Sequence, residues 1–242
     1  RKKSLLVDFG TNNSRIEGRP RREIFDVIIS DLSTIKSKNL LLTHFHMDHL
    51  SGLLYMMKKK DISVDFGKIY LPDVFSKKEM SRTLVLLLLA DLLKESGLPS
   101  RQVSLFALVD ALLENKQNVE LLSRGKLFEN KYQALWPDTD VIRKETDEVY
   151  NRICEDGKFK EVMDVLLEFA EKLRLIVWSM TAEGNKPAET MERETDSTAS
   201  ELTEQPEVRQ KIIRAYVYER EFRRIKALPD FKKLLAWLNE NQ

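Results

Sequence analysis

Residues 40–53 of this 242-residue chain read LLLTHFHMDHLSGL, and the stretch holds all three of its histidines. Three imidazoles and a carboxylate packed this closely are the ligands that a borderline-soft divalent ion such as zinc prefers. In an extended or tightly turning segment, His44 and His46 point the same way, whereas Asp48 and His49 can turn toward a second point nearby. The pattern therefore predicts a short loop that holds parts of two metal-binding shells.

The residues before this loop have the pattern of an α/β unit. Residues 4–10 read SLLVDFG, an apolar strand that ends in Asp and Gly, and residues 40–42 predict a second strand. Between them, apolar residues recur at spacings of one, three and four over residues 21–33, which predicts a helix. Ligands of such strand–helix–strand units bind at the carboxyl ends of the strands. The histidine loop thus begins where a site is expected.

The run THFHMDH resembles the T-H-x-H-x-D-H signature of the metallo-β-lactamase superfamily and departs from it nowhere. The segment SLLVDFG resembles the first motif of that family, and the resemblance covers roughly residues 4–75. It implies an α/β fold, a partial αββα sandwich, to which the rest of the chain adds a helical insertion and C-terminal helices. It also implies a hydrolase in which one or two zinc ions, or manganese or iron, activate water.

The resemblance assigns a role to each polar residue of the two motifs. It implies His44 and His46 as ligands of one ion, and Asp48 and His49 as ligands of a second. The remaining roles fall to three residues: Asp48 also orients the attacking water, Thr43 braces the loop, and Asp8 supports the ligands from outside. On the residues alone, two other interpretations stay open, in which the histidines are ordinary surface residues and Asp8 is only a turn or helix cap.

The second half of the family pattern is not found. Its members carry further histidine and Gly-Asp motifs, but no histidine follows His49. The 8 glycines among 242 residues are also few, against a typical share of about 7%. We therefore expect a fragment whose site is completed by sequence outside the chain. The alternative is a degenerate, non-catalytic member that recruits a partner, such as a component of a bacterial defence system.

Composition excludes some classes of partner and location. The net charge of +1 gives no global argument for nucleic acid. The single cysteine, Cys154, excludes an internal disulfide and suits the reducing cytoplasm. The apolar run at residues 84–93 is too short to span a membrane. Asp138 and Asp140 follow a proline and read as a turn or helix cap, with a metal-binding role as the less favoured alternative.

The choice of substrate rests on charge and on the resemblance. Basic residues in the loop after Asp8 favour a phosphodiester substrate and nuclease-like activity; they are Arg15, Arg19, Arg21 and Arg22. Basic and aromatic residues at 209–226 could bind a phosphate backbone, but a solvated helix face is the favoured interpretation. The C-terminal helices are expected to serve as a docking surface for a protein partner.

The chain divides into five predicted segments. The first carries the metal loop, the second and third are mostly helical, the fourth is rich in Glu, Thr and Ser with few large apolar residues and predicts disorder, and the fifth is two amphipathic helices. Their ranges are 1–76, 77–130, 131–182, 183–206 and 207–242.

Overall fold

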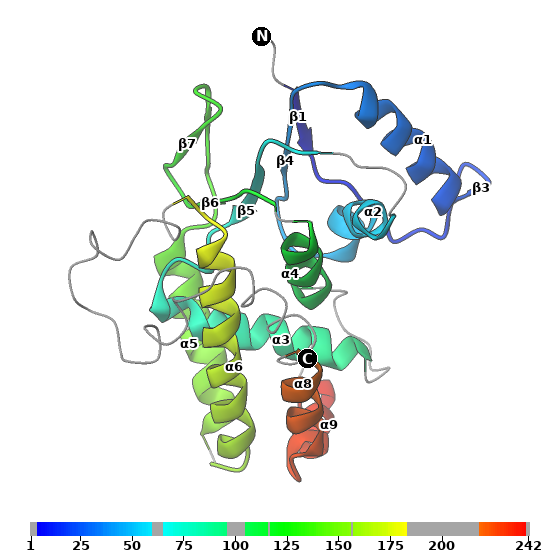
Figure 1. Cartoon of the computed structure of the whole chain (residues 1–242). Helices are drawn as coiled ribbons and strands as arrows, with labels where there is room; N and C mark the ends of the chain where they lie inside the picture. Colours follow the sequence, from blue (N-terminus) through cyan, green and yellow to red (C-terminus); the bar gives the residue numbers. More distant parts are fainter. Residues whose placement is uncertain are drawn as a thin grey trace.

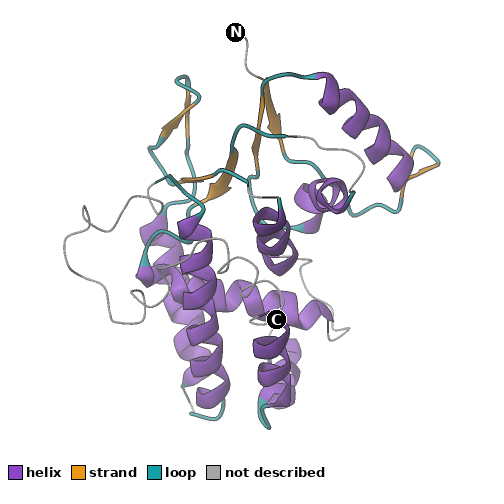
Figure 2. Ribbon diagram, viewed as in Figure 1, coloured by secondary structure: helices purple, strands orange, loops and turns teal. Residues whose placement is uncertain are grey.

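The computed structural model describes residues 4–59, 65–95, 105–115, 117–155, 157–182 and 218–240. These residues form a mixed α/β fold with one four-stranded parallel sheet, and a layer of helices beneath it (Figures 1 and 2). Eight α-helices lie within these ranges. The segment at 183–206, which we predict to be disordered, lies outside them.

The sheet consists of β1 (Ser4–Val7), β4 (Lys38–Leu41), β5 (Ile69–Pro72) and β6 (Val119–Leu122), in that order. Each strand pairs in parallel with the strand that precedes it in the sheet. The strands are short apolar runs whose alternate residues face opposite sides. Leu40 and Leu71 belong to the main core, whereas Leu41 and Tyr70 face the other side.

Helices cover one face of the sheet. They are α1 (Arg21–Thr34), α2 (Met47–Lys58) and α4 (Leu105–Glu114), which connect or precede successive strands. Their buried residues join those of the sheet in one apolar cluster, which includes Phe25, Leu53 and Leu108. The predicted helix at 21–33 is confirmed. Helix α2 begins three residues earlier than the predicted helix at 50–60, so it includes Asp48 and His49 in its first turn.

A second group of helices packs below the first. It consists of α3 (Ser81–Glu95), α5 (Thr139–Cys154), α6 (Lys160–Ser179), α8 (Tyr218–Ala227) and α9 (Phe231–Glu240). The leucine-rich α3 contacts α4, α5 and α6, as expected for a helix that is apolar on nearly every side. The apolar residues of the two C-terminal helices predict that these helices pack on the rest of the chain, and Leu234 and Leu235 of α9 are indeed buried in the main core. Ile212, Ile213 and Tyr216 lie outside the described ranges.

The other face of the sheet is only partly covered. A hairpin of β7 (Leu127–Phe128) and β8 (Tyr132–Gln133) packs over it, on the opposite side from α1 in Figure 1. Glu129 at its tip accepts hydrogen bonds from Tyr70 Oη, at 2.6 Å, and from Asn39. Val7 at the end of β1 stays 51% exposed. The hairpin thus covers the β5–β6 half of this face and leaves the β1 end open.

The structure refines what the sequence pattern predicts for three short segments. Residues 120–126, read as a turn or a short extended piece, begin within the fourth strand of the sheet, because Val119 and Leu121 are buried against the helices. The strand expected at 131–138 is limited to the two residues of β8, and the ambiguous segment at 173–179 is the end of helix α6. Within the described part of the chain, no helix combines the length and apolarity needed to cross a membrane.

Candidate metal centre

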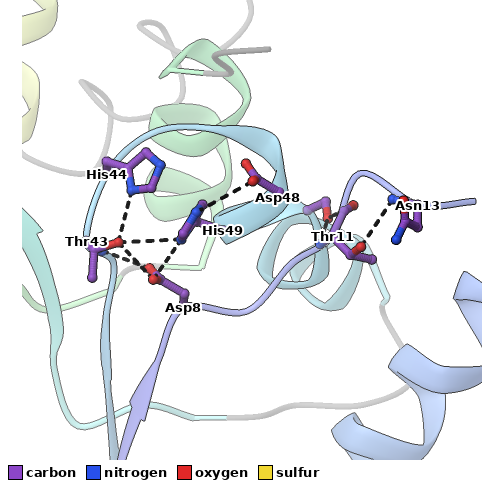
Figure 3. A network of polar contacts seen from close by, with 8 residues as sticks. Asp8, Thr11, Asn13, Thr43, His44, Asp48 and His49 are labelled. Atoms are coloured by element: carbon purple, nitrogen blue, oxygen red, sulfur yellow. Dashed lines mark hydrogen bonds and ion pairs between the residues drawn. The ribbon is translucent and has the colours of Figure 1, made fainter. Parts of the chain in front are cut away.

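The loops after β1 and β4 meet at the carboxyl edge of the sheet, where Asp8 joins them (Figure 3). Asp8 has a φ of 54°, a left-handed conformation that Asp adopts more readily than most residues. Its carboxylate accepts hydrogen bonds from the backbone N–H and from Oγ1 of Thr43, both at 2.8 Å. The carboxylate therefore fixes the first residue of the histidine loop, as predicted for a supporting residue.

The same carboxylate also binds His49. The distance between His49 Nδ1 and Asp8 Oδ2 is 2.7 Å. Because an ionised carboxylate only accepts hydrogen bonds, this contact favours the proton on Nδ1 and leaves a lone pair on Nε2. The free Nε2 lies 3.6 Å from Asp48 Oδ2. Asp8 therefore prepares His49 for a role as ligand or base on the side where Asp48 lies.

A similar argument applies to His44 through Thr43. The Thr43 hydroxyl has one proton, which it donates to Asp8, so it can accept the proton of His44 Nδ1 at 3.0 Å. This arrangement leaves the lone pair of His44 Nε2 available to bind a metal ion. The Asp8 carboxylate thus contacts one imidazole directly and a second through a hydroxyl.

Three residues bring their ligand atoms together. The donor atoms of His44, His46 and Asp48 all lie within 4.8 Å of one another. The ring centroids of His44 and His46 are 4.7 Å apart, and those of His44 and His49 are 3.7 Å apart. His49 is not part of this three-residue group, and its Nδ1 contacts Asp8. The structure therefore places Asp48 beside His44 and His46, and also 3.6 Å from Nε2 of His49, with which the sequence order pairs it.

The electrostatic environment favours the neutral form of His44. Partial burial and the nearby His49 and His46 rings hold the pKa of His44 below its usual value, while Asp8 and Asp48 act in the opposite direction. A protonated imidazole cannot bind a metal ion, so a lowered pKa makes His44 available as a ligand at neutral pH.

Close backbone packing holds helix α2 against the loop after β1. Phe9 donates its N–H to the carbonyl of His49 at 2.7 Å and accepts the N–H of Gly52 at 2.9 Å. A Cβ on Gly10 would lie 2.7 Å from the backbone nitrogens of residues 50 and 51. A Cβ on Gly52 would lie 2.6 Å from the Phe9 ring. Both glycines therefore allow the first turn of α2, with Asp48 and His49, to reach Asp8.

Two further residues in this contact were not predicted. Ser51 Oγ accepts the N–H of Thr11 and donates to its carbonyl, both at 2.9 Å. Ser51 is buried, although it is a polar residue. A small polar residue in an otherwise apolar helix turn is the sequence feature that indicates this contact. Arg21 Nη1 also donates to the Thr11 carbonyl, at 3.0 Å. The loop that leads to the basic hairpin is thus attached to α2, and Figure 3 shows Thr11 beside Asp48.

The favoured interpretation of Asp138 is confirmed. Its side chain caps α5 by accepting the N–H groups of Asp140 and Val141. Arg124, at 2.8 Å, is the main reason why the pKa of Asp138 lies below its usual value. Asp138 therefore has a complete structural role at the start of this helix.

A cavity of about 480 Å³ lies along the outer edge of β6, at the far side of the sheet from the histidine loop. Its lining includes Lys68, Glu120, Lys126 and Trp178, and none of the residues of the candidate metal centre.

Comparison of the chain with protein-family models, with curated proteins and with solved structures gives no match. The function must therefore be argued from the metal centre itself.

Proposed function

We propose that this chain is a metal-dependent hydrolase of the metallo-β-lactamase type, with its metal site at the end of β1 and β4. The observation that supports this most directly is the convergence of His44, His46 and Asp48, whose donor atoms lie within 4.8 Å of one another. Two imidazoles and a carboxylate are a usual ligand set for catalytic zinc, which keeps its fourth position for water or substrate.

The separations fit a zinc ion after a small adjustment. Zinc–nitrogen and zinc–oxygen bonds of about 2.1 Å place tetrahedral ligand atoms about 3.4 Å apart. The observed limit of 4.8 Å is larger, so the ligand side chains must rotate by a small amount to reach a common ion. Asp8 and Thr43 then act as the hydrogen-bond partners that orient metal-binding imidazoles.

A divalent ion at this place would supply Lewis acidity, polarising the scissile bond and acidifying water. The protein's own groups complete the chemistry. Asp48 is in position to orient a water molecule and accept its proton, and the Nε2 of His49 faces the same space. Because Asp48 is in the first turn of α2, the positive end of that helix also favours negative charge in the substrate.

The substrate class that we propose is a phosphodiester. The β2–β3 hairpin (Arg15–Ile16 and Arg19–Pro20) begins two residues after Asn13, which lies on the Asp48 side of the loop in Figure 3. Arg15, Arg19 and Arg22 are all exposed there. Exposed guanidinium groups in the segment that follows Asp8 are suited to bind phosphate oxygens.

Zinc binding tests the proposal. The purified protein should bind one to two equivalents of zinc, manganese or iron by elemental analysis, and the double variant His44→Ala, His46→Ala should lose most of it. For the variant Asp48→Ala, which is used in the turnover test below, the matched control is Asp140→Ala, because Asp140 is also an exposed acidic residue in the first turn of a helix. Unchanged metal content in the double variant would refute the site.

A second candidate is a non-catalytic, metal-binding interaction protein. The partly open face of the sheet favours it, because Val7, Leu127 and Leu135 are exposed on or beside that face. Turnover distinguishes the two candidates. Metal-dependent cleavage of bis(p-nitrophenyl) phosphate that is lost in Asp48→Ala and kept in Asp140→Ala supports the hydrolase, whereas metal binding without turnover supports the second candidate.

A further inference from the structure

The histidine loop is supported from below by an aromatic pair. Phe45, which stands between His44 and His46, is buried and packs edge-to-face on Phe75, with ring centroids 6.0 Å apart. Phe75 has no exposed surface. Since buried side chains are closely packed, a shift of Phe75 would be transmitted to Phe45 and, through the backbone, to the two histidines beside it.

Phe75 belongs to a tight loop after β5. Asp73 shapes this loop, because its carboxylate accepts the N–H of Ser76 at 3.0 Å and the hydroxyl of Ser76 at 2.7 Å. Asp73 itself is held to β6 by its N–H, which donates to the carbonyl of Leu122 at 2.9 Å. The backbone of residues 73–76 is thus fixed at one end by the sheet.

The other end is held by an arginine from helix α6. Arg174 Nη1 lies 3.3 Å from the carbonyl oxygen of Phe75 and 3.4 Å from that of Ser76. Its Nε donates to Glu171 at 3.0 Å, and Glu171 also accepts the hydroxyl of Ser81. The Arg174 side chain is only 11% exposed. Burying a guanidinium is costly unless its partners are well placed.

We propose that Arg174 is a positioning residue for the metal centre. By holding the carbonyls of residues 75 and 76, it sets the place of the Phe75 ring, and through Phe45 the spacing of His44 and His46. This inference rests on the proposed function for its meaning, but the mechanical coupling can be measured without metal. If Arg174 only attached α6 to the loop, it would stabilise the fold, and its replacement would leave the positions of the histidines unchanged.

The test uses Arg174→Lys, which keeps the charge but not the planar fork, and Arg174→Met. The control is Arg82→Met. Arg82 of helix α3 forms an ion pair with Asp147 of helix α5 at 2.7 Å, and neither residue belongs to the 73–76 loop. For each variant, we would measure the thermal midpoint, the zinc affinity by chelator competition, and the visible spectrum of the cobalt-substituted protein.

We expect Arg174→Lys to weaken zinc binding about tenfold, as is typical for residues that support metal ligands, and to change the cobalt spectrum. Arg82→Met should lower the thermal midpoint while zinc affinity stays within twofold of the wild type. Zinc affinity and a cobalt spectrum that are unchanged in both Arg174 variants would overturn the inference.

The metal-free protein provides an independent measurement. In nitrogen-correlated NMR spectra of the three imidazoles, Arg174→Lys should shift the signals of His44 and His46, and the signal of His49, which Asp8 holds, should shift least. If Arg174→Met does not fold, Arg174→Lys and Phe75→Leu give the same comparison. A wild-type protein that binds no metal refutes the proposed function, whereas unshifted imidazole signals refute only the role of Arg174.

Discussion

Replacing Gly10 with alanine should damage the candidate metal centre from behind. The new Cβ would lie 2.7 Å from two backbone nitrogens of α2 and 2.9 Å from the carbonyl oxygen of Asp48. Ordinary contacts begin near 3.4 Å, so the helix start must retreat by about 0.7 Å. All three obstructing atoms are backbone, and none can swing aside as a flexible side chain could.

This displacement of the start of α2 costs folding free energy and moves particular side chains. Overpacking of this kind costs about 1–3 kcal/mol of folding free energy. The displaced turn carries Asp48 and His49 away from Asp8, whose 2.7 Å contact with His49 should lengthen. We therefore expect Gly10→Ala to reduce both the free energy of unfolding and the affinity for zinc.

Urea unfolding and chelator competition measure the two effects. Gly18→Ala is the control, because Gly18 has a φ of 78° but open space around its Cβ position. It should cost only about 1–2 kcal/mol through backbone strain and leave zinc affinity unchanged. If Gly10→Ala unfolds at the wild-type urea concentration and binds zinc as tightly as the wild type, the close contact has no energetic role and this reasoning fails.

Three further predictions concern single side chains. Asp8→Asn keeps the shape and tolerates the left-handed backbone, but it removes the charge that fixes His49, so zinc affinity should fall about 10–100-fold in chelator competition; an unchanged affinity would exclude Asp8 from the site. Asp91→Ala removes the buried carboxylate that accepts the N–H of Phe106 at 3.1 Å, and urea titration should show a loss of about 1–3 kcal/mol; a loss below 0.5 kcal/mol, on the order of a surface substitution, would contradict it. Burial raises the pKa of Tyr150 to about 12, so the folded protein keeps this proton while the unfolded chain loses it above about pH 10. The free energy of unfolding should therefore fall by about 1.4 kcal/mol for each pH unit between pH 10 and 12, and Tyr150→Phe should remove that part of the slope; an equal slope in the variant would refute the pKa shift.

Individual strands and helices could be predicted from the sequence because their residue patterns are strong. The apolar run before Asp8 and the helical spacing at residues 21–33 each report one strand or helix directly. The four-residue strand β6 was read as turn-like because its role depends on pairing with β5, about fifty residues earlier. A short run of mixed residues carries no signal of such a distant partner.

The residues suited to bind a metal ion could also be recognised from the sequence, but which of them lie together in the fold could not. The sequence order suggested Asp48 and His49 as a pair, since they are neighbours. In the folded chain, Asp48 lies near His44 and His46 as well as near His49, and His49 also contacts Asp8, which lies 41 residues away. The pairing depends on where α2 begins, and the first turn of a helix is the boundary that sequence patterns define least well.

The order of the strands in the sheet is the order of the strands in the chain. Each new strand is added to the edge of the one before, so Asp8 and the histidine loop can come together while most of the polypeptide is still being synthesised. Arg174 reaches the loop below them only when helix α6 arrives. The contacts around Asp8 thus join residues from the start of the chain, whereas the loop beneath them is held by an arginine from much later in the sequence.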